Sequence, residues 1–191
     1  MHTTLIIDTV TGLLIGARQV LSPHFDERPP AVKPALIVVH GISLPPGEFG
    51  GPWIDRLFCG NLPAGHATGS GQASFANIAN LRVSAHAVIG RGGDITQYVS
   101  FAARAWHAGE SSYQGRAACN DFSVGIELEG TDEIPYTEPQ YRSLSQLILA
   151  LCEAYPTLGV AQLAGHSDIA PGRKSDPGPA FDWPRLRALL A

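Results

Sequence analysis

Ala35-Leu36-Ile37-Val38-Val39-His40-Gly41 is the stretch that decides the fold class of this chain. Its aliphatic and β-branched residues form a continuous run that is too short for a helix and typical of a strand buried on both faces. Such strands belong to sheets that helices cover, so we expect an α/β domain. His40 would end this strand, and open α/β sheets bind their ligands beyond the carboxyl ends of their strands.

A second strand is expected over residues 122–130, where apolar residues alternate with other types. One face would carry Val124, Ile126 and Leu128, and the opposite face Gly125, Glu127 and Glu129. Shorter strands over residues 84–89 and 95–99 would form a hairpin, because the glycine-rich residues 90–94 between them favour a turn.

The clearest helix is predicted over residues 137–154. Thr137 and Gln140 form a capping-box pattern at its start, and an apolar stripe follows at helical spacing. Pro156 would end it. Near the C-terminus, Asp182 would cap a final helix that carries several leucines.

The other segments are less regular. Residues 1–20 would form either an ordered arm or an edge strand around 13–20, and residues 53–58 a short helical turn. Loops are expected where proline or glycine is frequent, at residues 22–34, 41–52 and 60–72.

Length and composition favour one domain, residues 1–191, because 191 residues with 45% hydrophobic residues suffice for one full core. The net charge of −4 disfavours a nucleic-acid partner. Cys59, Cys119 and Cys152 match no disulfide framework, which suggests reduced thiols. The N-terminus lacks a signal-peptide pattern, and no apolar segment approaches the ~18 residues of a membrane span. We therefore expect a soluble cytoplasmic protein without a membrane partner.

A loop rich in proline, residues 165–179, contains His166 and Asp176. Imidazole and carboxylate both bind zinc, and a catalytic zinc commonly takes three protein ligands and leaves a fourth position to water. His40 is the best distant third ligand, so we expect a zinc site of His40, His166 and Asp176. Spacing alone leaves another interpretation open, in which these side chains only bond backbone groups and cap turns.

Two acids share one face of the predicted strand 122–130. Glu127 lies deeper in the strand than Glu129, and burial raises the pKa of a carboxyl towards the working pH, which suits a general base. We therefore favour Glu127, although both acids could lie on a solvated sheet face. Lys174 lies two residues before Asp176 and could stabilise an oxyanion, or could be an ordinary surface lysine.

The other histidines have less distinctive surroundings. Trp106 and His107 stand before Gly109, where an aromatic ring beside an imidazole can face a sugar or a peptide, or can simply pack. His86, inside a predicted strand, is typical of a hydrogen-bonded core histidine. The surroundings of His24 do not decide between packing and a cleft. His2 and His66 are expected to be solvated.

Six collinear segments carry a family resemblance. They are residues 38–52, 81–86, 105–109, 119–123, 125–131 and 165–178. Together they resemble the zinc N-acetylmuramoyl-L-alanine amidases, a family that includes phage lysozyme-type amidases and peptidoglycan recognition proteins. Within it, the chain is most similar to the bacterial 1,6-anhydro-N-acetylmuramyl-L-alanine amidases. The resemblance extends from about residue 22 to about residue 184.

The resemblance implies a mixed β-sheet flanked by helices, with a zinc cleft at one face. It implies roles for the residues chosen above: zinc ligands at His40, His166 and Asp176, a proton acceptor at Glu127, and transition-state stabilisation by Lys174. It also implies substrate contacts by Arg82, Trp106 and His107, with Arg82 placed to meet a carboxylate of the stem peptide.

The activity that the resemblance implies is hydrolysis of the amide between the lactyl group of anhydro-N-acetylmuramic acid and L-alanine, during peptidoglycan recycling. The expected partner is a small muropeptide, and a monomer is expected. The alternatives are a peptidoglycan-binding module without activity and an amidase of intact cell wall. Gly41 departs from the family, which usually has Asn after the zinc histidine, and residues 62–75 are longer and richer in glycine than expected.

Overall fold

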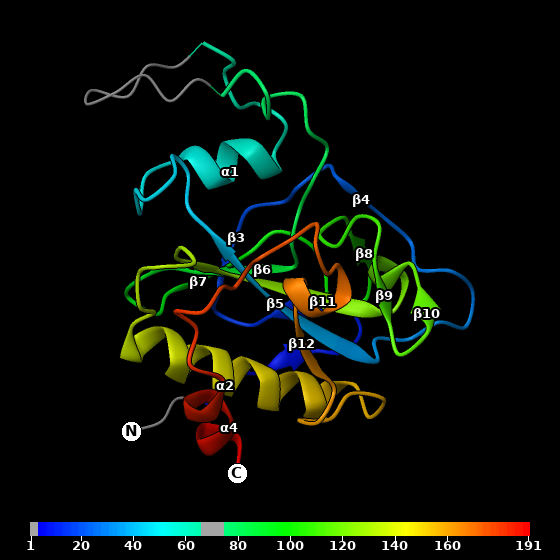
Figure 1. Ribbon diagram of the computed structural model, residues 1–191. Helices are drawn as coiled ribbons and strands as arrows, with labels where there is room; N and C mark the ends of the chain where they lie inside the picture. The colour runs from blue at the N-terminus through cyan, green and yellow to red at the C-terminus, as the bar shows by residue number, and fades with distance from the viewer. Residues whose placement is uncertain (1–3, 66–74) are drawn as a thin grey trace.

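The computed structural model describes residues 4–65 and 75–191. Within these ranges, six strands form one mixed sheet in the order β12-β5-β11-β6-β7-β3 (Figure 1). Their bounds are Leu163–Gly165 (β12), Leu36–Ile42 (β5), Ser123–Glu129 (β11), Ala87–Ile89 (β6), Ile95–Gln97 (β7) and Arg18–Gln19 (β3). The first four run parallel, whereas β7 is antiparallel to β6 and parallel to β3.

The two longest strands, β5 and β11, lie side by side at the centre of this sheet. The four apolar residues 36–39 have no exposed surface, which confirms the prediction of a strand buried on both faces. β5 extends beyond the apolar run to Ile42, because β11 continues to pair with it there. The register places Glu127 beside His40, so their side chains project from the same face.

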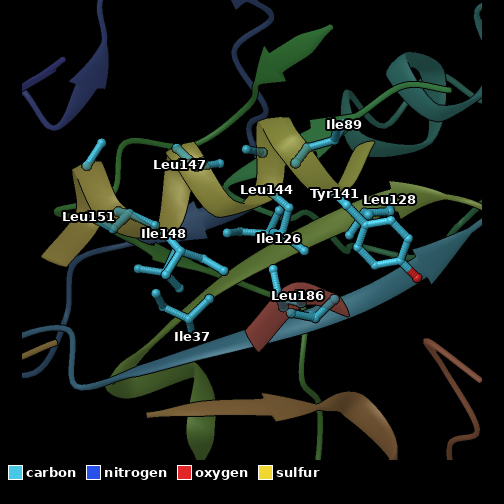
Figure 2. Close-up of a cluster of buried hydrophobic side chains, with 14 of the residues drawn as sticks. Ile37, Ile89, Ile126, Leu128, Tyr141, Leu144, Leu147, Ile148, Leu151 and Leu186 are labelled. Atoms are coloured by element: carbon cyan, nitrogen blue, oxygen red, sulfur yellow. The ribbon is translucent and has the colours of Figure 1, made fainter. Parts of the chain in front are cut away.

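Two helices cover one face of the sheet, α2 (Glu138–Ala154) and α4 (Trp183–Leu190). Figure 2 shows the buried cluster between the layers. It contains Ile37, Ile126 and Leu128 from the sheet, Leu144, Ile148 and Leu151 from α2, and Leu186 from α4. Apolar residues of β11 thus point to the helices, as the alternation predicts.

Side-chain caps begin both helices. Thr137 Oγ1 accepts a hydrogen bond from the Gln140 N–H, and Gln140 Oε1 accepts one from the Thr137 N–H, so the predicted capping box is confirmed. Asp182 accepts from the Arg185 N–H at the start of α4. Such caps typically contribute about 1 kcal/mol each.

The sheet order and the cluster packed between the sheet and the helices confirm the expected mixed sheet flanked by helices.

The opposite face carries the helix α1 (Trp53–Phe58), the short helix α3 (His166–Ile169) and long loops (Figure 1). One apolar cluster forms under α1 and includes Ile54, Phe58 and Val88. Another forms under α3 and includes Val38 and Ile169. The polar side chains of β5 and β11 emerge between these clusters.

Smaller elements surround the sheet. They are the pairs β1 (Ile7–Asp8) with β2 (Leu13–Leu14), β4 (Phe25–Asp26) with β8 (Arg104–Ala105) and β9 (Ser112–Tyr113) with β10 (Arg116–Ala117), and the 3-10 helix η1 (Cys119–Asp121).

Some boundaries differ from the expected ones. Of residues 13–20, only Arg18–Gln19 joins the central sheet, because Leu13–Leu14 pairs with β1 instead. The hairpin of β6 and β7 is confirmed, but its first strand begins at Ala87, since the N–H groups of Ser84 and His86 bond outside the hairpin.

Some expectations lie outside the described residues, namely those for His2, His66 and residues 66–72. All three cysteines are free. Across residues 4–65 and 75–191, no helix has both the length and the apolar character needed to cross a membrane.

Candidate metal centre and active site

Three side chains converge on the sheet face opposite α2, as the sequence led us to expect. Nδ1 of His40 lies 2.9 Å from Nδ1 of His166 and 3.1 Å from Oδ2 of Asp176. The distance between His166 Nδ1 and Asp176 Oδ2 is 3.0 Å. Separations of this size suit three atoms that each lie ~2.0–2.2 Å from one zinc ion. The grouping can therefore hold a metal ion.

Local structure explains how residues so distant in sequence meet. His40 lies near the end of β5, and His166 is the first residue of α3, directly after the neighbouring strand β12. Asp176 follows in the next loop, where its carbonyl oxygen accepts a hydrogen bond from the Ser167 N–H at 2.9 Å. The Tyr136 hydroxyl donates to the carbonyl oxygen of Pro177 at 3.0 Å and holds the other side of the ligand.

In each histidine ligand, Nε2 is the outer ring nitrogen, which points away from Asp176. Its hydrogen bond tests whether a metal fits. Nε2 of His166 lies 3.2 Å from the carbonyl oxygen of Ala108, which can only accept, so Nε2 carries the proton. The lone pair of Nδ1 then faces the carboxylate of Asp176. Two acceptors facing each other repel unless a cation lies between them. The donor set therefore fits zinc.

The charges of the site also agree with metal binding. Burial lowers the pKa of His40 to about 4, so this imidazole is neutral at pH 7. Burial alone would raise the pKa of Asp176, but its interactions with His166 and His40 outweigh burial and hold that pKa below its usual range. A neutral imidazole and an ionised carboxylate are the forms that bind zinc.

Glu127 is beside this group on β11 and is not tied down. Its Oε2 is buried and has no hydrogen-bond partner among the described residues. Burial raises the pKa of Glu127 well above its usual value; the negative charge of Asp176 raises it further, and Lys174 opposes both effects. A carboxylate with a buried oxygen that has no other partner is suited to accept a proton from a reacting water.

Glu129 differs from Glu127 although both lie on one strand face. Its Oε1 accepts from the Gly50 N–H at 2.6 Å, and its Oε2 lies 3.4 Å from the Arg91 nitrogen as a weaker contact. Glu129 therefore fastens the loop that contains Gly50. These contacts support Glu127 as the reactive acid.

Lys174 is exposed in the loop that contains Asp176, along a surface hollow that Asp176 and Gly41 also line. Its positive charge is close enough to lower the pKa values of both His40 and Glu127. The structure thus brings together five of the expected site residues: His40, Glu127, His166, Lys174 and Asp176.

Arg82 and Trp106 form a separate pair. The guanidinium carbon of Arg82 lies 5.3 Å from the centre of the Trp106 ring. The indole N–H donates to Asp26 at 3.0 Å, and the His24 ring stacks on the indole at 6.1 Å between centroids. Arg82 is exposed and offers a cation to solvent, whereas Trp106 is half-buried between its neighbours.

His107 lies behind the metal ligands and is buried. Its Nδ1 is 2.9 Å from Nε2 of His40, and its Nε2 is 3.1 Å from Oγ of Ser123. Both ring nitrogens are therefore engaged within the protein. This placement does not support the expectation that His107 faces the substrate.

His86 is a hydrogen-bonded core histidine, as predicted. Its Nδ1 accepts from the Gly125 N–H at 3.0 Å, and its Nε2 lies 3.2 Å from the carbonyl oxygen of Ala103. Burial and, to a smaller extent, the nearby charge of Arg28 lower the pKa of His86 to about 3, so the ring is neutral at pH 7.

Gly41 has a structural cause. A Cβ at this position would lie 2.3 Å from the hydroxyl oxygen of Tyr136, which is buried against Gly130 and bonded to Pro177. A side chain at position 41 therefore competes with Tyr136 for the same space. Sequence reasoning missed Tyr136, for which the glycines at positions 41 and 130 were the only local signal.

We expect Gly41→Ala to lower the free energy of unfolding by about 1–3 kcal/mol, because the added methyl overpacks a buried contact. In the Tyr136→Phe background the hydroxyl is absent, and the next ring atom would be 3.6 Å from the new Cβ. The same substitution should then cost far less. Denaturant unfolding of the four proteins of this cycle checks the coupling, and equal costs in both backgrounds would contradict it.

Two histidines and a carboxylate that could hold a metal ion, with a further acid beside them, suit a hydrolase, and comparison with known proteins defines the class. The family model described as N-acetylmuramoyl-L-alanine amidase matches residues 30–179. The chain therefore belongs to the N-acetylmuramoyl-L-alanine amidase family, and is an enzyme of that kind.

Individual relatives agree. The 1,6-anhydro-N-acetylmuramyl-L-alanine amidase AmpD of Escherichia coli (strain K12) is 59% identical over 181 residues, which cover 94% of this chain and 95% of the relative. A crystal structure of a selenomethionine AmpD derivative superposes with a TM-score of 0.90 at 56% identity, over 97% of this chain and 99% of that one. AmpDh3 from Pseudomonas aeruginosa in complex with anhydromuramic pentapeptide gives a TM-score of 0.59 at 28% identity, over 82% of this chain and 59% of that one.

Proposed function

We propose that this amidase hydrolyses the bond between the lactyl group of 1,6-anhydro-N-acetylmuramic acid and the L-alanine of the stem peptide, with zinc held by His40, His166 and Asp176. The similarity to AmpD over nearly the whole chain supports the substrate. The more distant AmpDh3, whose structure contains an anhydromuramic pentapeptide, supports the same class of ligand.

One observation carries the chemistry: the ligand atoms of His40, His166 and Asp176 converge beside a buried carboxylate oxygen of Glu127 that has no partner among the described residues. When bound, zinc would polarise the scissile carbonyl and lower the pKa of a water to ~7. Glu127 would orient that water from the neighbouring strand.

Glu127 and Lys174 would perform the proton and charge steps. Glu127 takes one proton from the attacking water, whose oxygen bonds to the amide carbon. Lys174 stabilises the oxyanion that forms on the former carbonyl oxygen. Glu127 then passes its proton to the nitrogen of L-alanine as the carbon–nitrogen bond breaks. The products are the lactyl carboxylic acid and a peptide with a free amine.

Exposed Arg82 and half-buried Trp106 would contact the substrate away from the reacting bond. A guanidinium binds carboxylates, of which a stem peptide has several, and an indole face suits a sugar or a peptide. We assign His107 to the support of His40 instead of the substrate. A monomeric state, a cytoplasmic location and a role in peptidoglycan recycling remain part of this proposal.

Incubation of the zinc-loaded protein with an anhydromuropeptide should give two products whose summed mass exceeds that of the substrate by one water. Mass spectrometry checks this directly, and the fragment masses identify the bond. Binding without any change of mass would instead indicate a peptidoglycan-binding module. Faster release from intact cell wall than from anhydromuropeptide would favour the cell-wall amidase.

A further inference from the structure

Consecutive residues of one segment contact the outer nitrogens of both histidine ligands. Nε2 of His40 lies 2.9 Å from Nδ1 of His107, and Nε2 of His166 lies 3.2 Å from the carbonyl oxygen of Ala108. The carbonyl oxygen of Ala108 can only accept, so it places the proton of His166 on Nε2 and leaves the Nδ1 lone pair for the metal. Zinc on Nδ1 of His40 requires the same tautomer there, in which Nδ1 of His107 accepts from Nε2 of His40. The position of this two-residue segment therefore sets the orientation of both rings.

A single side-chain atom binds both backbone N–H groups of that segment. Oδ1 of Asn120 accepts hydrogen bonds from the N–H of His107 at 3.1 Å and from the N–H of Ala108 at 2.8 Å. Both residues are buried, so without Oδ1 these two donors would lose their partner away from water. The backbone of Asn120 is itself held, because its backbone carbonyl oxygen accepts a hydrogen bond from the Arg28 guanidinium at 3.2 Å.

The neighbouring residues leave the segment little room for another position. A Cβ on Gly125 of β11 would lie 2.4 Å from Cγ of His107, so the glycine admits this ring beneath His40. From the other side, Arg173 donates to the carbonyl oxygen of Ala108 at 2.6 Å. The two hydrogen bonds of Asn120 thus fix the position of residues 107 and 108 between Gly125 and Arg173.

We propose that Asn120 is a positioning residue of the metal centre: by binding both N–H groups of residues 107 and 108, it keeps the acceptors for His40 and His166 in place and so fixes both tautomers. The proposal rests on the zinc site proposed above. Asn120 is not one of the three proposed metal ligands, and its effect passes through the two residues it binds. Outer contacts of this kind typically change metal affinity by about 10- to 100-fold.

The test measures zinc affinity by competition with a chelator. Asn120→Ala removes the acceptor and should weaken zinc binding by about 10- to 100-fold. Asn120→Asp keeps an oxygen acceptor, so its zinc affinity should stay within about threefold of wild type, a much smaller change than the loss expected for Asn120→Ala. Asp121→Asn is the matched control, because it alters the next residue of η1 and its ion pair with Arg104 but not the bonds to residues 107 and 108.

A second readout needs no metal. Nitrogen chemical shifts of the imidazoles in metal-free protein should show the Nε2–H tautomer for His40 and His166 in the wild type, and a mixture in Asn120→Ala. If Asn120→Ala does not fold, His107→Phe removes one of the two acceptors and should weaken zinc binding through His40 alone.

The outcomes separate the two proposals. Unchanged zinc affinity and unchanged tautomers in Asn120→Ala, or unchanged affinity in His107→Phe, would overturn the role of Asn120. An equal loss of affinity in Asp121→Asn would also overturn it, since the effect would then be general destabilisation. A wild-type protein that binds no zinc would contradict the proposed function, and the tautomers of the metal-free protein would still decide the role of Asn120.

Discussion

Glu127→Gln should lower kcat by about 10²- to 10⁴-fold while zinc affinity stays close to that of the wild type. The amide has nearly the shape of the carboxylate but cannot take a proton from water. Glu127 is not among the side chains that converge on the metal position, so the metal should still bind. Single-turnover kinetics on an anhydromuropeptide, together with zinc content, check both parts.

Glu129→Gln is the matched control, because it makes the same chemical change two residues along the same strand face. Glu129 accepts hydrogen bonds from backbone N–H groups, and an amide can replace only some of these. We expect a loss of about 1 kcal/mol in the free energy of unfolding and little change in kcat. A larger fall in kcat for Glu129→Gln than for Glu127→Gln would show that the roles of the two acids are reversed.

The elements predicted from the sequence are those with local causes. The continuous apolar run of β5, the alternation in β11 and the capping box of α2 each depend on neighbouring residues, and each is confirmed. The edge strand β3 has only two residues and depends on pairing with β7, which is far away in the sequence. No local pattern could give its limits.

The same division applies to the site. Residue type points to His40, His166 and Asp176 as ligands, and the order of the strands brings them together. The residues beside His107 in the sequence do not predict its environment, because a neighbouring tryptophan does not show whether the imidazole faces the substrate or the interior. Gly125 was the available signal: a glycine on the reactive face of a strand of larger residues marks a place where another group, here the His107 ring, comes close.

Removal of zinc by a chelator should abolish hydrolysis, and added zinc should restore it, because Lys174 can stabilise an oxyanion but cannot lower the pKa of the attacking water as a bound zinc would. The metal-free protein should also unfold at lower temperature. Without a cation the lone pairs of His40 and His166 face the carboxylate of Asp176 at about 3 Å. Zinc at 100 times its Kd should stabilise the fold by about 2.7 kcal/mol, which thermal unfolding can measure.

Two variants distinguish loss of the metal from damage to residues 165–179, the segment that contains His166 and Asp176. Asp176→Asn replaces the anionic ligand by a weakly coordinating amide, so we expect it to lose both zinc and turnover. Asp168→Asn makes the same change in the neighbouring helix α3 but keeps an oxygen that can accept from the Gly165 N–H, a bond of 2.7 Å in the native protein. This control should retain zinc and most activity. Full turnover by the chelated protein, or by Asp176→Asn without zinc, would contradict the metal-dependent mechanism, because Glu127 and Lys174 would then suffice to activate water and amide on their own.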